Sequence, residues 1–244
     1  MSEWQCLLWD VDGTIAETER DGHRVAFNLA FAQAGLDWGW DERRYGKLLH
    51  ITGGRERLLH FMQGRDDVPR DPVAQEELAA RLHQLKNQHY AAVVNEGLIP
   101  ARPGVLNLIR EARAAGVRQG IATTTSRSNV QALLGRLLGA DWRSWFEVVV
   151  CGEDTQRKKP DPEVYLKALQ SLGLEADQAV AIEDSSPGVA AALAAGLQVW
   201  WRPSVYFPSL GSDHLASPKV ASWAALPPGR CRAARVWSAC RTDE

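Results

Sequence analysis

The stretch CLLWDVDGT, residues 6–14, sets four consecutive apolar residues directly before two aspartates and a glycine. A short apolar run that ends at polar turn residues is typical of a strand buried on both faces, as in a parallel sheet. Ligands of open parallel sheets bind beyond the carboxyl ends of the strands, so Asp10 and Asp12 follow the strand where a site is expected. Residues two apart can face the same way, which lets two carboxylates share one cation.

Two other readings of this stretch are weaker. A calcium loop of the D-x-[DN]-x-[DN]-G type needs an acid or amide and then a glycine where the chain has Thr14 and Ile15. A plain turn after a strand explains neither the acid pair nor the matching polar segments further along the chain. The stretch therefore favours a functional site.

The second half of the chain alternates apolar runs with helical patterns. Strands are predicted at 117–122, 147–150, 179–182 and 197–201, and helices at 104–115, 130–138, from Asp161 onward, and at 187–195. Strands separated by helices of about 10–15 residues predict βαβ units and a parallel sheet. We therefore expect an α/β fold with a Rossmann-like core.

Residues 20–97 interrupt this alternation. The segment contains helical patterns at 25–34 and 73–93 and no convincing strand. We interpret it as an α-helical cap inserted after the first strand. The predicted domains are a core of residues 1–18 and 98–224, a cap of residues 19–97, and a flexible tail of residues 225–244.

The composition excludes several classes of protein. The 244 residues are 45% hydrophobic and 24% charged, as in ordinary globular proteins, so disordered and fibrous classes are disfavoured. The 28 basic and 30 acidic residues give a net charge of −2, without the excess positive charge typical of nucleic-acid or membrane binding. No apolar run is long enough to span a bilayer, and the four cysteines form no C-x-x-C pair. We expect a cytoplasmic monomer.

Three further polar segments follow predicted strands. Thr123 and Thr124 offer hydroxyl and backbone N–H groups suited to phosphate oxygens. Lys159 supplies a positive charge next to a proline, and Glu183 with Asp184 forms a second acid pair. Each segment alone is a weak signal, but their order and their strand context together indicate one site.

These four segments, DVDGT, ATT, KP and EDS, resemble the motifs of the haloacid dehalogenase-like hydrolase superfamily along about residues 5–210. The resemblance implies that Asp10 is a nucleophile forming an aspartyl-phosphate and that Asp12 is the general acid and base. It also implies that Mg²⁺ is bound by the Asp10 carboxylate, the Asp12 backbone carbonyl and the Asp184 side chain, with Glu183 in a supporting position. The transferred phosphate would be held by Thr123, Thr124 and Lys159.

The presence or absence of an aspartate at the position of Asp12 also distinguishes phosphoryl transfer from dehalogenation within this superfamily. Dehalogenases lack an aspartate two residues after the nucleophile, because a halide leaving group needs no proton. The presence of Asp12 therefore favours phosphoryl transfer.

Three segments narrow the resemblance: AETERDGHRVAF from Ala16, TGGRER from Thr52 and ATTTSRSNV from Ala122. They resemble the CbbY-type branch, which includes xylulose-1,5-bisphosphate phosphatases that clear an inhibitory misfire product of rubisco in the Calvin cycle. We expect hydrolysis of a small sugar phosphate, preferably xylulose 1,5-bisphosphate. The alternatives are a phosphomutase of the related β-phosphoglucomutase type and a catalytically silent phosphate-binding regulator. A dinucleotide-binding oxidoreductase is disfavoured because no G-x-G-x-x-G follows the first strand.

Further residues are candidates for binding the rest of the substrate. Arg55 follows two glycines, and its guanidinium suits a distal phosphate. We expect the neighbouring Arg57 to be solvated. The full set of substrate-binding candidates is Glu19, Gly53, Gly54, Arg55, His83, Lys86, Thr125, Ser126, Arg127 and Asn129.

Overall fold

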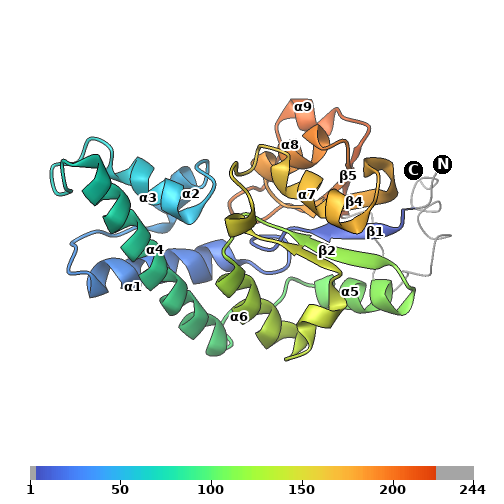
Figure 1. Cartoon of the computed structure of the whole chain (residues 1–244), viewed down its shortest axis with the longest axis horizontal. Coiled ribbons are helices and arrows are strands. Elements are labelled where there is room, and N and C mark those ends of the chain that lie inside the picture. The colour runs from blue at the N-terminus through green and yellow to red at the C-terminus, as the bar shows by residue number, and fades with distance from the viewer. Residues whose placement is uncertain (1–3, 224–244) are drawn as a thin grey trace.

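A parallel six-stranded sheet lies at the centre of one half of the molecule in this computed structural model, which describes residues 4–223 (Figure 1). The strands are β1 (Cys6–Trp9), β2 (Arg118–Ala122), β3 (Val148–Val150), β4 (Ala179–Glu183), β5 (Gln198–Trp201) and β6 (Val220–Ser222). Their order across the sheet is β3-β2-β1-β4-β5-β6, the Rossmann order. The predicted α/β class with a parallel Rossmann-like sheet is confirmed.

Side chains of β1 alternate between two apolar layers. Leu7 and Trp9 pack with α5 (Val105–Ala114) and α6 (Arg127–Leu138) on one face of the sheet. Cys6 and Leu8 pack with α7 (Glu163–Leu172) and α8 (Ser186–Ala194) on the other. This two-sided burial explains the continuous apolar run that precedes Asp10.

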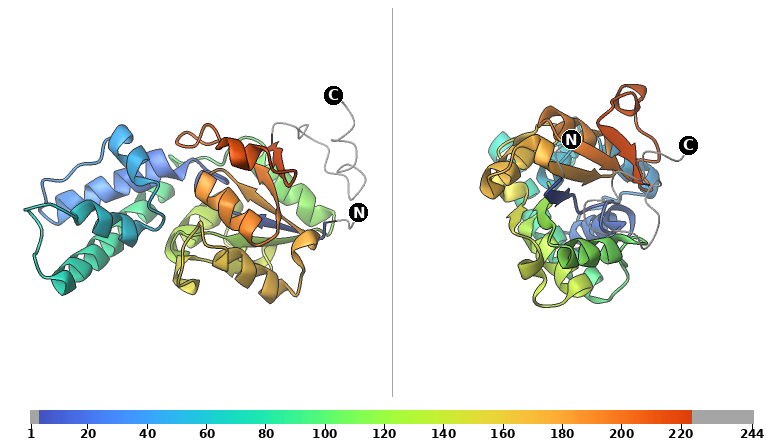
Figure 2. Two further views of the ribbon diagram at one scale, coloured as in Figure 1. Left: turned by 90° about the horizontal axis from the view of Figure 1, so that it is seen from above. Right: turned by 90° about the vertical axis from the view of Figure 1, so that its right-hand side faces the viewer.

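The strand register brings the ends of three strands to one level. Trp9 pairs with Ile121 of β2 and with Ile182 of β4. The residues that follow β1 and β2, and those at the end of β4, therefore lie at the same edge of the sheet. That edge faces the helical half of the molecule (Figures 1 and 2).

Residues 19–97 form the helical half and contribute no strand to the described sheet. Their helices are η1 (Glu19–His23), α1 (Arg24–Gln33), α2 (Glu42–Leu48), α3 (Gly54–Met62) and α4 (Pro72–Asn95). An aromatic cluster that includes Phe27, Phe31, Trp38, Trp40 and Tyr45 holds these helices together. The long helix α4 packs on α1 and α3 and also contacts α6. We propose this segment as the cap, with the boundaries predicted above.

The structure also contains elements that the sequence patterns did not predict. They include the π-helical turn η1, β6, α2, α9 (Ser212–Leu215) and three 3₁₀ turns, η2 (Trp142–Trp145), η3 (Gly152–Asp154) and η4 (Ala176–Gln178). Within residues 4–223 no helix is both long and apolar enough to cross a membrane. The predicted tail, residues 225–244, lies outside the described residues.

Candidate active site

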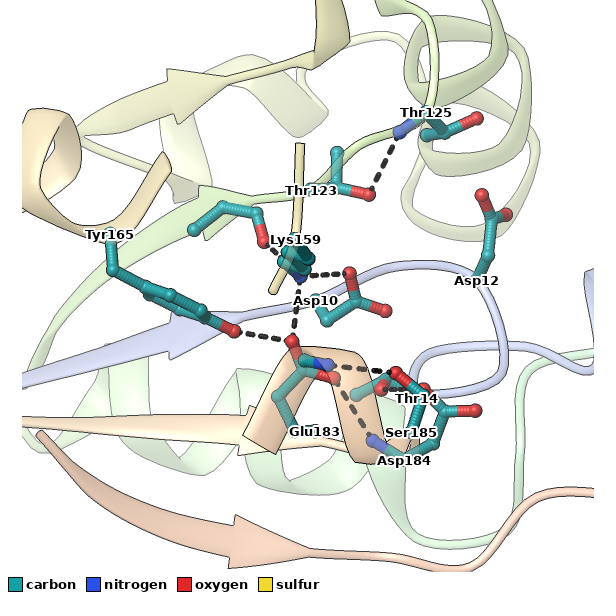
Figure 3. A network of polar contacts seen from close by, with 12 residues as sticks. Asp10, Asp12, Thr14, Thr123, Thr125, Lys159, Tyr165, Glu183, Asp184 and Ser185 are labelled. Atoms are coloured by element: carbon teal, nitrogen blue, oxygen red, sulfur yellow. Dashed lines mark hydrogen bonds and ion pairs between the residues drawn. The ribbon is translucent and has the colours of Figure 1, made fainter. Parts of the chain in front are cut away.

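Five buried polar side chains meet at the carboxyl edge of the sheet. Asp10 follows β1, Thr123 follows β2, and Glu183 and Asp184 come from the end of β4, while Lys159 lies on the loop before α7 (Figure 3). The structure thus brings together the residues of all four motifs found in the sequence.

Lys159 is the centre of this group. Its Nζ donates to Asp10 Oδ1 and Glu183 Oε1, both at 2.6 Å, and to the Ala122 carbonyl at 3.0 Å. Tyr165 adds a hydrogen bond from its hydroxyl to Glu183 Oε1 at 2.5 Å. Burial alone would lower the pKa of the Lys159 amine, but the two carboxylates raise it above its ordinary value, so the amine stays charged.

The carboxylates outnumber this single cation. Oxygen atoms of Asp10, Glu183 and Asp184 all lie within 4.8 Å of one another. Burial and the nearby Glu183 raise the pKa of Asp10 to about 8, although Lys159 opposes the shift. Burial, Asp10 and Glu183 raise the pKa of Asp184 well above its usual range. Buried oxygen donors with excess negative charge suit a hard divalent cation such as Mg²⁺.

Gly13 allows the Asp184 carboxylate to approach the loop that follows β1. Its φ is +79°, and a Cβ at this position would lie 2.1 Å from Asp184 Oδ2. A side chain here would both strain the backbone and displace the carboxylate. Thr14 adds a contact of 3.4 Å from its hydroxyl to Asp184 Oδ1.

The Asp12 side chain stands apart from this network (Figure 3). Thr18 Oγ1 donates to Asp12 Oδ1 at 2.6 Å, and His23 Nε2 lies 2.9 Å from the same oxygen, an ion-pair distance. Burial would raise the pKa of Asp12, but His23 and Thr18 hold it below its ordinary value. Sequence reasoning missed both partners, since their position depends on the π-helical turn η1.

Two adjoining cavities open next to these residues. The larger, of about 690 Å³, lies between the helical segment and the sheet edge, and the smaller, of about 60 Å³, contains the Asp10 and Lys159 side chains. The larger is lined by most substrate-binding candidates: Glu19, Gly53, Gly54, Arg55, His83, Lys86, Thr125 and Ser126. Asp12 and Thr124 line both cavities.

Lys86 brings a buried positive charge to the larger cavity. It is 3% exposed, and its Nζ lies 5.4 Å from the Phe27 ring centroid and 5.3 Å from that of Tyr90. Burial lowers the pKa of the amine to about 8, while Asp12 and Glu19 oppose the shift. Within residues 4–223 no carboxylate contacts this amine directly, and a buried amine in that state is suited to an anionic ligand.

The other helical-side candidates differ in charge state. Burial and Lys86 lower the pKa of His83 to about 3, so this imidazole is neutral at physiological pH. Arg55 forms an ion pair with Glu76, and both side chains are about half exposed, at 51% and 47%. Arg57 is 6% exposed and lines both cavities, so the prediction that it is solvated is wrong.

Two sequence candidates have side chains outside the described cavity linings. Arg127 pairs with Asp154, and its backbone N–H donates to the Glu153 carboxylate. Asn129 is buried and donates from Nδ2 to Thr125 Oγ1 at 3.1 Å. Asn129 is therefore placed to support Thr125 rather than to reach the larger cavity itself. Cys151 is buried, and burial raises the pKa of its thiol to about 12, so it is no candidate nucleophile.

Comparison with known proteins identifies the family of the chain. The family model of the haloacid dehalogenase-like hydrolases matches residues 4–196. The chain is 46% identical over 202 residues to plasmid protein CbbY of Cupriavidus necator, covering 83% of this chain and 79% of that protein. It is 45% identical over 215 residues to protein CbbY of Rhodobacter capsulatus, covering 88% of this chain and 91% of that protein.

Solved structures show the same relationship. A crystal structure of CbbY from Rhodobacter sphaeroides in complex with xylulose-(1,5)bisphosphate matches with a TM-score of 0.81 at 38% identity. The match covers 91% of this chain and 98% of that chain. A putative β-phosphoglucomutase from Thermotoga maritima matches in fold with a TM-score of 0.62 at 24% identity. The chain therefore belongs to the haloacid dehalogenase-like hydrolase family, in the CbbY-type branch, and is a phosphatase acting on phosphoric monoesters.

Proposed function

We propose that this phosphatase depends on Mg²⁺ and hydrolyses a sugar bisphosphate, with xylulose 1,5-bisphosphate as the preferred substrate. The observation that carries the proposal is a pair of cation-bearing regions in two adjoining cavities that share lining residues. Lys159 lies in the smaller cavity, and Arg55, Arg57 and Lys86 line the larger one. A substrate with a phosphate at each end matches this distribution of charge. The similarity to CbbY, whose structure contains that bisphosphate, supports the same choice.

In the proposed reaction, an Asp10 carboxylate oxygen attacks phosphorus and forms an aspartyl-phosphate. The bond to the sugar oxygen breaks, and Asp12 donates a proton to that oxygen. Asp12, now a carboxylate, then takes a proton from water as the water oxygen attacks phosphorus and releases Asp10. Two displacements replace one more difficult displacement.

The negative charge of the substrate favours the protonated form of Asp12, which is the form that acts as general acid in the first step. His23 and Thr18 stabilise its carboxylate form in the free protein. A phosphate dianion beside Asp12 raises the pKa of that carboxyl, since a like charge disfavours ionisation. Asp12 therefore takes up a proton from solvent as the substrate binds and donates that proton to the leaving oxygen.

The remaining core residues hold the transferred group. Thr123 and Thr124 offer hydroxyl and N–H donors, and Lys159 offers its ammonium. Mg²⁺ would be held by Asp10, Asp184 and the Asp12 backbone carbonyl, where it offsets negative charge on the phosphoryl oxygens. Glu183 keeps Lys159 oriented toward Asp10.

The test is phosphate release from paired sugar monophosphates and bisphosphates, with and without chelator. We expect EDTA to abolish activity, Mg²⁺ to restore it, and the bisphosphates to be hydrolysed with the higher kcat/KM. Full activity after exhaustive chelation, or no preference for any bisphosphate, would contradict the proposal. Conversion of a glucose 1-phosphate to its 6-phosphate, with a trace of bisphosphate, would instead indicate a phosphomutase. The cytoplasmic location and the monomeric state stay predictions.

A further inference from the structure

A carboxylate lies among the cations of the larger cavity, at Glu19. This side chain lines both cavities, so it stands where the space around Asp10 joins the space beneath α3 and α4. Its Oε2 accepts a hydrogen bond of 2.5 Å from the hydroxyl of Tyr45, whose side chain is fully buried in α2. A fixed negative charge at this point is unexpected in a site for phosphates, because it repels them.

Arg57 fixes the direction of the Tyr45 hydroxyl. Its Nη1 donates to the phenol oxygen at 3.1 Å, its Nε donates to the Leu48 carbonyl at 3.2 Å, and its guanidinium carbon lies 5.2 Å from the Tyr45 ring centroid. Because Arg57 donates to the phenol oxygen, the single phenol proton is left for Glu19. Burial and Glu19 raise the pKa of Tyr45 well above its usual range, so the phenol keeps that proton.

We propose that Tyr45 and Arg57 are positioning residues that orient the Glu19 carboxylate to accept a hydroxyl group of the substrate. A carboxylate accepts hydrogen bonds from hydroxyl groups and disfavours phosphate oxygens in the same place. Glu19 therefore selects for a hydroxylated carbon chain between the two phosphate-binding regions. This inference rests on the proposed function, because it concerns the part of a sugar phosphate that lies next to the reacting phosphate.

The test compares two substrates that differ in their oxygen substituents alone. Xylulose 1,5-bisphosphate and pentane-1,5-diol bisphosphate carry the same phosphates on the same length of carbon chain. We expect the unaltered protein to prefer the sugar, and Tyr45→Phe and Glu19→Gln each to reduce that preference in kcat/KM about tenfold, mainly through KM. The double variant should lose no more than the larger single loss, because the two residues act as one unit.

A matched control is available in Tyr206. Its hydroxyl has no hydrogen-bond partner within residues 4–223, and its ring centroid lies 5.9 Å from that of Tyr45. Tyr206→Phe removes the same atom from a neighbouring ring, and it should leave the preference unchanged. Thermal unfolding of each variant checks that the fold is retained.

Two results would overturn the inference. One is an unchanged preference in both Tyr45→Phe and Glu19→Gln. The other is an equal loss on both bisphosphates, which would give these residues a structural role only. Xylulose 5-phosphate and pentyl phosphate form a second pair in the same assay. If bisphosphates prove no better than monophosphates, the proposed function fails, and the preference within the second pair still decides this inference.

Discussion

Asp10 and Asp12 are two residues apart and both are desolvated by burial, yet their charged and hydrogen-bonding neighbours differ. Asp10 contacts Lys159 and lies beside two further buried carboxylates, which together with burial raise its pKa to about 8. Asp12 contacts Thr18 and His23, which hold its pKa below the ordinary value. A divalent cation held by Asp10 and Asp184 would lower the pKa of Asp10 again and keep it ionised as the nucleophile, whereas Asp12 gains its proton when a phosphate lies beside it.

The first prediction concerns Asp10. Asp10→Asn should keep the fold and lower kcat by at least ~10³, because an amide is a poor nucleophile and no other nucleophile takes its place in this mechanism. Steady-state phosphate release measures the loss, and thermal unfolding checks the fold. Activity near that of the unaltered protein would remove Asp10 from the mechanism.

The second prediction concerns the pH dependence set by Lys86, which faces the carboxylates of Asp12 and Glu19, the guanidinium of Arg57 and the neutral imidazole of His83. Its amine, with a pKa lowered to about 8, is charged below that pH and neutral above it. Since kcat/KM reports the free enzyme, we expect its value for the bisphosphate to fall roughly tenfold as pH rises through this range.

Lys86→Arg provides the control, since arginine keeps its charge at these pH values. If deprotonation of Lys86 causes the decrease in kcat/KM at alkaline pH, the Lys86→Arg variant should keep its kcat/KM for the bisphosphate to a higher pH than the unaltered protein. If kcat/KM decreased in the same way in both proteins, another titrating group would be responsible for the decrease.

At the scale of elements, the start of α3 explains how the helical segment presents Arg55. The α4 side chain His83 packs closely against Gly54, where an added Cβ would lie 2.8 Å from its ring. This close approach of α3 and α4 sets Arg55 opposite Glu76 at the margin of the larger cavity.

The third prediction follows from this placement. Arg55→Ala should lower kcat/KM for xylulose 1,5-bisphosphate about 10- to 150-fold, the range expected for one charge-assisted hydrogen bond to a distal phosphate. Hydrolysis of an aryl monophosphate should change little, since that substrate has no distal phosphate. Equal losses on both substrates would contradict a distal-phosphate role.

Glu76→Ala is the matched control. It removes the same ion pair but leaves the guanidinium free for the substrate, and a half-exposed pair contributes only about 0–1 kcal/mol to stability. The activity of Glu76→Ala on the bisphosphate should be equal to or above that of the unaltered protein. A loss that matched Arg55→Ala would point to the ion pair itself.

Some helices, strands and contacts were predictable from the sequence, and others were not. The apolar runs of β1 and β4 are continuous because both faces are covered, so their type was predictable, and the predicted end of β4 fell one residue short. The edge strand β6 has only three half-buried or exposed residues and no period that could reveal it. Arg57 is buried because Tyr45 and Leu48 receive its hydrogen bonds, and these partners come from another helix and its end. Such pairings depend on tertiary packing rather than on local spacing.

At the scale of the whole molecule, the two connections between the helical segment and the sheet run side by side. The Arg102 backbone N–H donates to the Ile15 carbonyl at 2.8 Å, and Ala16 pairs with Ala101 in an antiparallel bridge. Further hydrogen bonds cross the cleft: Thr52 donates to the Lys159 carbonyl, and Asn87 donates to the Ser126 hydroxyl. The arrangement of the helical segment is thus linked directly to residues of the site.

The Arg102 side chain strengthens this junction. It is 11% exposed, donates to the carbonyls of Gly13 and Pro203, and lies 3.2 Å from a Glu17 carboxylate oxygen. One guanidinium therefore joins the loop that carries Asp10 and Asp12, the returning connection, and the segment after β5.

The last prediction is that Arg102→Met weakens this junction and the whole fold with it. The substitution keeps much of the side-chain length but leaves two carbonyls and a carboxylate without their donor, which should cost about 2–4 kcal/mol. For a chain of this size that loss lowers Tm by roughly 4–16 °C. Arg157→Met is the matched control, because Arg157 is 71% exposed and its ion pairs with Asp161 and Glu163 lie at the surface, so Tm should change by no more than about 2 °C. Thermal unfolding followed by circular dichroism compares the two variants. Equal Tm values would show that Arg102 does not hold the two halves together, whereas a selective fall with reduced kcat would tie the junction to the geometry of Asp10 and Asp12.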